Sequence, residues 1–229
     1  MDNPLHLIEI ENLGRDYIAG DTIVSAIQAM NFEIDDGEFV TIVGQSGAGK
    51  STLLSAMGGM NRPTRGRVVI DTLDIYGLTS EQRADFRSEY MGFIFQSFQL
   101  IPYLTTIENV KIPLSISGVQ SSRQDEMAES VLDRVGLSDK IDRLPDQLSG
   151  GEQERVAIAR AIVNGPPILL ADEPTGNLDS STASEVISLL KQLNNEGQTV
   201  IMVTHNEALC QYTDRTIRVK DGRCHLGHA

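Results

Sequence analysis

The stretch Gly44–Ser51, GQSGAGKS, constrains the possible fold more than any other part of the sequence. It satisfies the pattern G-x-x-x-x-G-K-[ST] and stands between the apolar run FVTIV and a segment from Lys50 that we expect to be helical. Glycines at this spacing let backbone N–H groups curl around phosphate oxygens, and the helix N-terminus adds about half a positive charge there. The pattern predicts a buried strand, a phosphate-binding loop and a helix in succession. An ordinary glycine-rich turn is the alternative.

The residue types in this loop indicate which of them bind phosphate and which bind metal. Lys50 is expected to bridge the β- and γ-phosphates of a nucleotide, and Ser51 is expected to ligate Mg²⁺. The predicted binding segment consists of Gly44, Gln45, Ser46, Gly47, Ala48, Gly49, Lys50, Ser51 and Thr52.

Two adjacent acids end a second apolar strand, ILLADEP at 168–174. Asp172 would hold Mg²⁺, and Glu173 would orient and deprotonate an attacking water as a general base. A pair of solvated acids at a strand end is the alternative, and the phosphate loop elsewhere in the chain favours the catalytic interpretation.

Three further residues carry weaker signals. His205 ends the strand TVIMVTH and could touch a γ-phosphate, although a histidine at a strand end is more often a structural hydrogen-bonding group. Gln96 follows the strand GFIF, and Tyr17 follows an expected edge strand. Neither residue stands out by its type alone.

A second glycine pair lies in LSGGEQ, at 148–153. Ser149 followed by Glu152 matches a capping box, which predicts a helix that begins near Ser149. A cap does not require Gly150 and Gly151, each of which lowers helix propensity by about 1 kcal/mol relative to alanine. Close approach of the backbone to a ligand would explain them.

Strand and helix patterns alternate along most of the chain. Strands are predicted at 5–10, 25–34, 38–44, 66–71, 91–96, 167–174, 199–205 and 215–222, with helices from Lys50, at 80–89, after Ser149 and around 186–193. The region 97–148 lacks strand patterns and shows helical spacing of Met127, Val131 and Val135, so we expect a mostly helical insertion. The alternation predicts an α/β fold with a mostly parallel core sheet.

Composition narrows the function. The chain has 229 residues, 40% of them hydrophobic, which suits one large domain. Its formal charge of −13 argues against nucleic acid as the main partner, since such binding needs clustered Lys and Arg. Cys210 and Cys224 lack metal-like spacing and are interpreted as reduced thiols, which favours the cytosol. The start MDNPLHLIEI is not a signal peptide and no run approaches a membrane span, so any work at a membrane is done from its side.

With these motifs in order, the chain resembles the nucleotide-binding subunit of an ABC transporter from Leu5 to Gly222. The finer features ADEPTGNLDS, LSGGEQERVAIARA and GFIFQSFQLIPYLTTIENV are most similar to the LolD/MacB branch, which serves lipoprotein release and macrolide efflux. The signature departs from the branch by reading Glu152-Gln153-Glu154 where glutamines are commoner.

The resemblance implies a fold and a set of roles. The fold is a P-loop NTPase core with an N-terminal antiparallel β-subdomain and an inserted helical subdomain, so 1–229 is one domain with its core at 1–96 and 149–229 and its helical part at 97–148. Tyr17 stacks on adenine, Gln96 links Mg²⁺ and the attacking water to the helical part, and His205 senses the γ-phosphate. Two copies bind ATP head to tail, so Ser149 and Gly151 of one copy complete the partner's site. Gly150 and Asp179 are the other nucleotide-binding residues that the resemblance implies.

The function that the resemblance implies is ATP hydrolysis that moves an integral membrane permease, for export or lipoprotein release, from the cytoplasmic face of the membrane. An ATPase that regulates a membrane signalling or division complex without transport is the main alternative. A chromosome or repair ATPase would need a coiled-coil insertion and a basic surface, and a small-molecule kinase would lack LSGGE.

Overall fold

The structure of the chain is a computed structural model that describes residues 6–226. Two compact units make up the chain: residues 1–84 with 199–229 form the first, and residues 85–198 form the second. Leu5, where the first predicted strand begins, lies outside the described residues.

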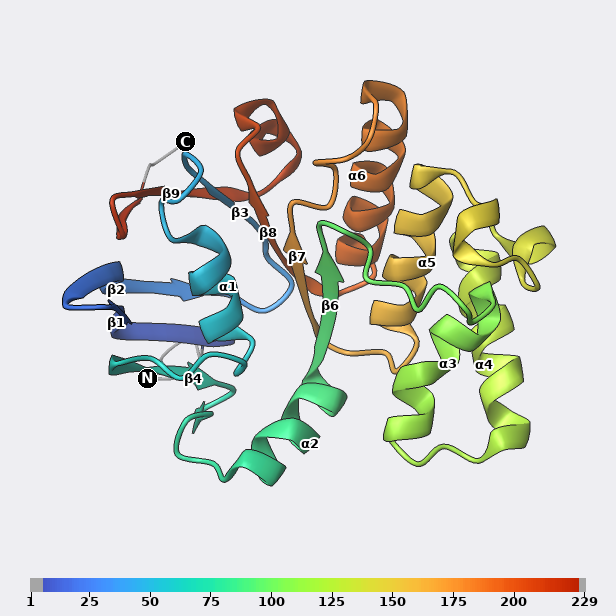
Figure 1. Cartoon of the computed structure of the whole chain (residues 1–229), viewed down its shortest axis with the longest axis horizontal. Helices are drawn as coiled ribbons and strands as arrows, with labels where there is room; N and C mark the ends of the chain where they lie inside the picture. The colour runs from blue at the N-terminus through green and yellow to red at the C-terminus, as the bar shows by residue number, and fades with distance from the viewer. Residues whose placement is uncertain (1–5, 227–229) are drawn as a thin grey trace. The chain divides into compact units, whose positions relative to one another are not determined.

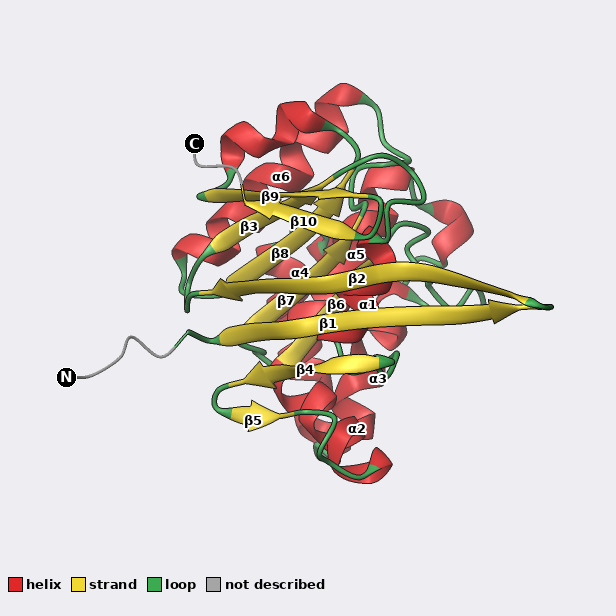
Figure 2. Cartoon of the chain, turned by 90° about the vertical axis from the view of Figure 1, so that its left-hand side faces the viewer, coloured by secondary structure: helices red, strands yellow, loops and turns green. Residues whose placement is uncertain are grey.

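The first unit contains an antiparallel sheet of four strands in the order β2-β1-β4-β5. Their bounds are β1 Ile8–Ala19, β2 Thr22–Ile34, β4 Arg65–Ile70 and β5 Leu73–Asp74. Figure 2 shows β1 and β2 as a long hairpin beside the shorter β4 and β5. Both strands are longer than predicted. Tyr17, expected to follow an edge strand, instead lies within β1, an inner strand of the sheet, where it is paired with Val24 of β2.

Parallel strands form the other part of the first unit. β3 Phe39–Val43 lies between β8 Thr199–Thr204 and β9 Arg215–Lys220, both parallel to it, and β10 Arg223–Leu226 pairs antiparallel with β9. All residues of β3 and β8 are buried, as their unbroken apolar runs predict for strands covered on both faces. The helix α1 Lys50–Met57 follows β3, and the short 3₁₀ helix η3 Glu207–Tyr212 follows β8.

The second unit contains two parallel strands, β6 Met91–Phe95 and β7 Ile168–Asp172, whose register joins Met91 to Ile168 and Phe95 to Asp172. Helix α2 Ser80–Tyr90 leads into β6. Two longer helices, α5 Gly150–Ile162 and α6 Ser180–Asn195, precede and follow β7. A Cβ at Gly92 would lie 2.3 Å from the carbonyl oxygen of Ala161, so the backbones of β6 and α5 approach as closely as only glycine allows.

The segment between β6 and α5 is helical, as predicted. It consists of α3 Thr106–Ile116, α4 Ser121–Arg134 and the 3₁₀ helices η1 Ser138–Lys140 and η2 Pro145–Gln147. α3 packs against both α4 and α5 (Figure 1). The second unit thus holds this segment together with β6, α5, β7 and α6, and a separate helical subdomain at 97–148 stays a prediction. The α/β class, with an antiparallel N-terminal sheet, parallel strands and inserted helices, is confirmed.

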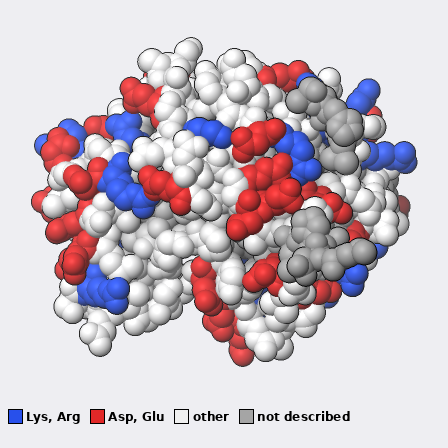
Figure 3. All heavy atoms as spheres, turned by 180° about the vertical axis from the view of Figure 1, so that it is seen from behind, with Lys and Arg blue, Asp and Glu red and all other residues white. Residues whose placement is uncertain are grey.

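The structure also tests the expectations about membrane spans and cysteines. Within residues 6–226 we find no helix with the length and apolar character needed to span a membrane. Cys210 and Cys224 are free thiols, as predicted. On the face drawn in Figure 3, the described Lys and Arg side chains lie among acidic and uncharged ones.

Candidate active site

The phosphate loop Gly44–Gly49 joins β3 to α1, as its sequence predicts. Two of its glycines have positive φ, 79° at Gly47 and 101° at Gly49, a conformation that other residues rarely adopt. A Cβ at Gly49 would lie 2.2 Å from the carbonyl oxygen of Ala26, and one at Gly44 would lie 2.1 Å from that of Val219. Neighbouring backbone therefore encloses the loop tightly on two sides.

Lys50 is the first residue of α1, and its side chain turns back beneath the loop. Its Nζ donates hydrogen bonds to the carbonyl oxygens of Gly44 at 2.8 Å and Gln45 at 3.1 Å, and the residue is only 7% exposed. The N-cap of α1 is Gly49, which has no side chain with which to cap the helix. A positive charge and a helix N-terminus thus converge on one loop, which is the arrangement that binds phosphate.

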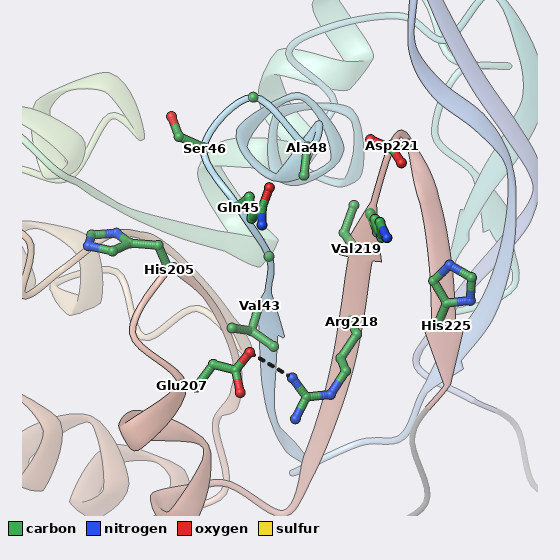
Figure 4. Close-up of a pocket in the computed structure, with 13 residues that line it drawn as sticks. Val43, Gln45, Ser46, Ala48, His205, Glu207, Arg218, Val219, Asp221 and His225 are labelled. Carbon is green, nitrogen blue, oxygen red and sulfur yellow. Dashed lines mark ion pairs between the residues drawn. The ribbon is translucent and has the colours of Figure 1, made fainter.

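A pocket of about 620 Å³ opens beside the loop (Figure 4). It is lined by the end of β3 and the loop, by the residues after β8, and by the β9–β10 hairpin: Val43, Gly44, Gln45, Ser46, Gly47, Ala48, His205, Glu207, Arg218, Val219, Lys220, Asp221 and His225. Val43 pairs in register with Thr204, so His205 follows β8 at the level where the loop leaves β3. The structure thus brings His205 to the phosphate loop. Its contact with a γ-phosphate stays a prediction.

Sequence reasoning missed the far wall of this pocket. Glu207 and Arg218 form an ion pair at 3.0 Å across it, drawn as a dashed line in Figure 4. Gly222, in the turn between β9 and β10, donates its N–H to the carbonyl oxygen of Ala48 at 3.1 Å. The dipeptide Asp221-Gly222 signals a hairpin turn but gives no sign that this turn supports the phosphate loop.

Tyr17 is not among the residues that line this pocket. The residue is 37% exposed on β1, and the guanidinium carbon of Arg15 stands 4.7 Å from the ring centroid. A cation over one face of an aromatic ring is attracted by the ring quadrupole. Tyr17 is therefore an aromatic platform with one face covered, and adenine stacking on it stays a prediction.

The second unit gathers Gln96, Asp172 and Glu173 at one end of its two strands. Phe95 and Asp172 are register partners, so Gln96 and Glu173 come directly after paired residues. A Cβ at Gly176 would lie 3.2 Å from Nε2 of Gln96 and 3.5 Å from Cβ of Glu173. Gln96 and Glu173 therefore flank the same short turn.

Glu173 has an unusual backbone. Its φ is 50°, in the left-handed region that glutamate rarely adopts, and the residue is 9% exposed. Its carbonyl oxygen accepts a hydrogen bond from the N–H of Gly176 at 2.9 Å, which closes the turn that holds this conformation. Such strain costs about 1–3 kcal/mol and concentrates at functional sites, which supports the choice of Glu173 over a solvated acid.

The capping box at the start of α5 is confirmed. Ser149 Oγ accepts from the N–H of Glu152 at 3.3 Å, and Glu152 Oε2 accepts from the N–H of Ser149 at 2.8 Å. The hydrogen bond from the Ser149 backbone lowers the pKa of Glu152 below its usual value. Ser149 and Gly150 are exposed, whereas Gly151 is buried against Thr182 of α6. Ser149 and Gly150 are therefore accessible to a second molecule.

Asp179 caps the next helix, α6. Its Oδ1 accepts from the N–H groups of Ser181 at 3.0 Å and Thr182 at 3.1 Å, and its Oδ2 accepts from the Thr182 hydroxyl at 2.7 Å. Hydrogen bonds from Ser181 and Thr182 lower the pKa of Asp179 far below its usual value. The Asp179 carboxylate thus caps α6 within its own chain, and its contribution to a nucleotide site stays a prediction.

The donors expected for Mg²⁺ are a hydroxyl, an amide and a carboxylate, from Ser51, Gln96 and Asp172. All are hard oxygen ligands of the kind Mg²⁺ prefers, and Mg²⁺ in nucleotide sites takes its other ligands from water and phosphate. Among residues 6–226 no three His, Cys, Asp or Glu side chains are grouped as a metal cage. The three donor types suit Mg²⁺, but Ser51 belongs to the first unit and Gln96 and Asp172 to the second, so their joint binding of Mg²⁺ stays a prediction.

Comparison with known proteins shows which family the chain is similar to. The profile of the ABC transporter family matches residues 27–176. The chain is 45% identical to the macrolide export ATP-binding/permease protein MacB of Vibrio parahaemolyticus over 94% of this chain and 33% of that protein, so it spans about a third of that relative. It is 42% identical to an ABC transporter ATP-binding protein of Thermotoga maritima, over 95% of this chain and 93% of that protein.

Solved structures agree with the sequence relatives. A dimeric structure of MJ0796, a bacterial ABC transporter cassette, superposes with a TM-score of 0.88 at 42% identity, over 95% of this chain and 96% of that one. A second structure of MJ0796, a dimer in a post-hydrolysis state bound to ADP and Pi, gives the same TM-score at 40% identity. With its motifs, its fold and these relatives in agreement, the chain belongs to the ABC transporter family.

Proposed function

We propose that this ABC-type ATPase binds ATP at Gly44–Thr52 and hydrolyses it with Glu173 as the general base. The Lys50 ammonium supports the proposal most directly, because two backbone carbonyls hold it beneath the loop where the β- and γ-phosphates would lie. The strained, largely buried turn at Glu173 supports the second part.

The remaining site residues bind Mg²⁺ and the nucleotide and orient the attacking water. Ser51, Asp172 and Gln96 would hold Mg²⁺, which would supply positive charge to neutralise the phosphates of the nucleotide. Gln96 orients the attacking water through its side-chain amide, and His205 donates to the γ-phosphate from the pocket beside the loop. Tyr17 stacks on adenine.

The site is completed by a second copy of the chain. Ser149, Gly150 and Gly151 of one copy face the γ-phosphate bound by the other, with the Asp179 loop beside them, in a symmetric dimer. The MJ0796 structure is also named as dimeric. Moving such a dimer from mostly open to mostly closed takes about 5.5 kcal/mol of differential binding. Charge-assisted hydrogen bonds contribute roughly 1.5–3 kcal/mol each, so about two per ATP suffice.

The partner that receives this motion is an integral membrane permease, reached from the cytoplasmic face. The macrolide export relatives are named ATP-binding/permease proteins, and the chain spans about a third of them. The helical segment at 97–148 would transmit the motion to the permease. Export of a small molecule or release of a lipoprotein is the transport that the branch similarity favours.

Affinity capture of the full protein from detergent-solubilised native membranes, with and without ATP, tests the permease proposal. Recovery of a permease together with an export adaptor or lipoprotein-release machinery supports it. Recovery of a regulator of a cell-wall hydrolase would favour the non-transport alternative. Recovery of no membrane protein would overturn the transport proposal while leaving the ATPase assignment intact.

A further inference from the structure

The segment that follows Gln96 turns through two consecutive left-handed residues. Phe98 has φ 59° and Gln99 has φ 50°, and neither is glycine. The N–H of Phe98 donates to the carbonyl oxygen of Phe95 at 2.9 Å, which folds the turn back onto the end of β6. Conformations of this kind persist only where surrounding structure enforces them, so this turn needs support from outside the segment.

Arg160 of α5 supplies that support. Its Nη2 donates to the carbonyl oxygen of Phe98 at 2.7 Å, and its Nη1 donates to that of Gln99 at 2.6 Å. Figure 1 shows this segment running from the end of β6 past α5. The planar guanidinium presents its donors in a fixed fork, so it can hold two adjacent carbonyl groups in one geometry, and hydrogen bonds from a charged donor are about twice as strong as neutral ones.

Glu154 is the acid whose charge acts on Arg160, but it does not accept a hydrogen bond from the Arg160 guanidinium. Glu154, on the same helix, is fully buried, and neither of its carboxyl oxygens has a hydrogen-bond partner among the described residues. Burial raises the pKa of Glu154 to about 8, so the group is mostly neutral at pH 7. Burial also lowers the pKa of Arg160, and the charge of Glu154 opposes that effect. Arg160 is therefore engaged with the turn rather than with a carboxylate.

Gln96 itself is held from its other side. The side-chain amide of Asn177 donates to the carbonyl oxygen of Gln96 at 2.7 Å, and Gly176 leaves room for the Gln96 amide. Asn177 belongs to the turn after Glu173, whereas Arg160 holds the residues that follow Gln96. These two contacts bracket Gln96 between the end of β7 and α5.

We propose that Arg160 is a positioning residue for Gln96: by holding the carbonyl groups of Phe98 and Gln99, it sets where the Gln96 amide stands beside Glu173. This inference rests on the proposed function, in which Gln96 serves Mg²⁺ and the attacking water. Arg160 touches neither, so its loss should affect the step that uses Gln96 and leave the phosphate loop, in the other unit, unaffected.

The test is steady-state ATP hydrolysis by the full chain, with ATP and Mg²⁺ varied separately. Arg160→Met should lower kcat about tenfold or more and raise the Mg²⁺ concentration for half-maximal rate, with the KM for ATP within about twofold. Arg160→Lys keeps the charge but not the fork, so it should recover part of kcat. Arg155→Met is the matched control, because Arg155 lies on the same helix in a surface ion pair with Glu185 at 3.2 Å, and it should behave as the parent.

A double-mutant cycle with Gln96→Ala separates this inference from the function on which it rests. If Arg160 acts through Gln96, the double variant should match Gln96→Ala in kcat and in Mg²⁺ dependence. Additive losses, or an Arg160→Met enzyme with unchanged Mg²⁺ dependence, would overturn the positioning role while Gln96 keeps its own. A Gln96→Ala enzyme with parental kcat and Mg²⁺ dependence would instead refute the function proposed for Gln96. If Arg160→Met does not fold, Arg160→Lys takes its place in the cycle.

Discussion

Gly151 lies against Thr182 so closely that a Cβ on Gly151 would stand 2.2 Å from the Thr182 methyl carbon. Thr182 cannot rotate away freely, because its hydroxyl donates to Asp179 at 2.7 Å. The first turns of α5 and α6 thus pack closely against each other because position 151 carries no side chain. By contrast, a Cβ on Gly150 would make an ordinary contact at 3.5 Å with Leu178.

Replacing Gly151 by Ala should therefore destabilise the protein by about 1–3 kcal/mol through overpacking. The double variant Gly151→Ala with Thr182→Ser should recover most of this loss, because serine lacks the obstructing methyl group and keeps a hydroxyl for Asp179. Gly150→Ala is the control and should fold as well as the parent. Urea unfolding of the four proteins measures the effect, and a failure of Thr182→Ser to rescue would exclude this contact as the cause.

Replacing Glu173 by Gln should give a protein that binds ATP and dimerises but hardly hydrolyses it. Loss of a general base lowers turnover by roughly 10²–10⁴-fold, while the amide keeps the size of the side chain. Phosphate release gives the rate, and gel filtration with ATP gives the dimer. Glu129→Gln, at an exposed position of α4, is the control. Turnover at the parental rate would remove Glu173 from the base role.

Replacing Ser149 by Trp should abolish cooperative hydrolysis and spare ATP binding by the monomer. Ser149 is exposed at the start of α5, and in the proposed dimer it faces the ATP of the partner, so the bulk of Trp would obstruct that approach. The change also removes the cap, which costs about 1 kcal/mol, and Ser149→Ala measures that part separately. Nucleotide titration at low protein concentration measures ATP binding by the monomer. The Hill coefficient of ATP hydrolysis measures cooperativity. A Trp variant that no longer binds ATP would contradict a site completed by the partner.

The stability of the protein should fall as pH rises from about 4.5 towards 8. Burial raises the pKa of Glu154 from 4.5 in the unfolded reference to about 8, so the folded state binds this proton more tightly. The penalty is absent below pH 4.5, grows through this window by at most about 1.4 kcal/mol per pH unit, and is constant above it.

Glu154→Gln should remove this slope and stabilise the protein at pH 7.5, as measured by urea unfolding across pH 5 to 8. Glu152→Gln is the matched control on the same helix. The pKa of Glu152 is lowered, so its stabilising contribution is lost only as pH falls below about 4.5, and the slope between pH 5 and 8 should remain. A parental slope in Glu154→Gln would show that another group carries it.

The buried strands could be predicted closely because their signal is local. The runs at 91–96, 167–174 and 199–205 correspond to β6, β7 and β8 within two residues at each end, since strands covered on both faces need continuous apolar sequence. The capping box at Ser149 is equally local, because both of its partners lie within one helical turn.

Strands that depend on distant pairing were harder to predict. β1 extends to Ala19 and β2 begins at Thr22 because irregular positions, among them Asn12 with φ 46° and Ala29 with φ 50°, let the hairpin continue where alternation breaks. β10 escaped prediction, since its four residues have no apolar pattern and are recruited by pairing with β9. In the site, motifs identified the residues expected to meet nucleotide, but not Asn177, Thr182 or Arg160. Asn177 contacts Gln96, Arg160 contacts Phe98 and Gln99, and Thr182 contacts Gly151, all far away in sequence, so no local pattern indicates these contacts.

The enclosure of the phosphate loop bears on how the protein is made. The loop occurs early in the chain, yet Val219 closes over Gly44 and the N–H of Gly222 holds Ala48, while β8 and β9 flank the strand that leads into it. During synthesis on the ribosome, the glycines at 44–49 therefore emerge long before the segments that shape them. We therefore expect the nucleotide-binding loop to reach this conformation, and to bind ATP, only after the β9–β10 turn has been translated.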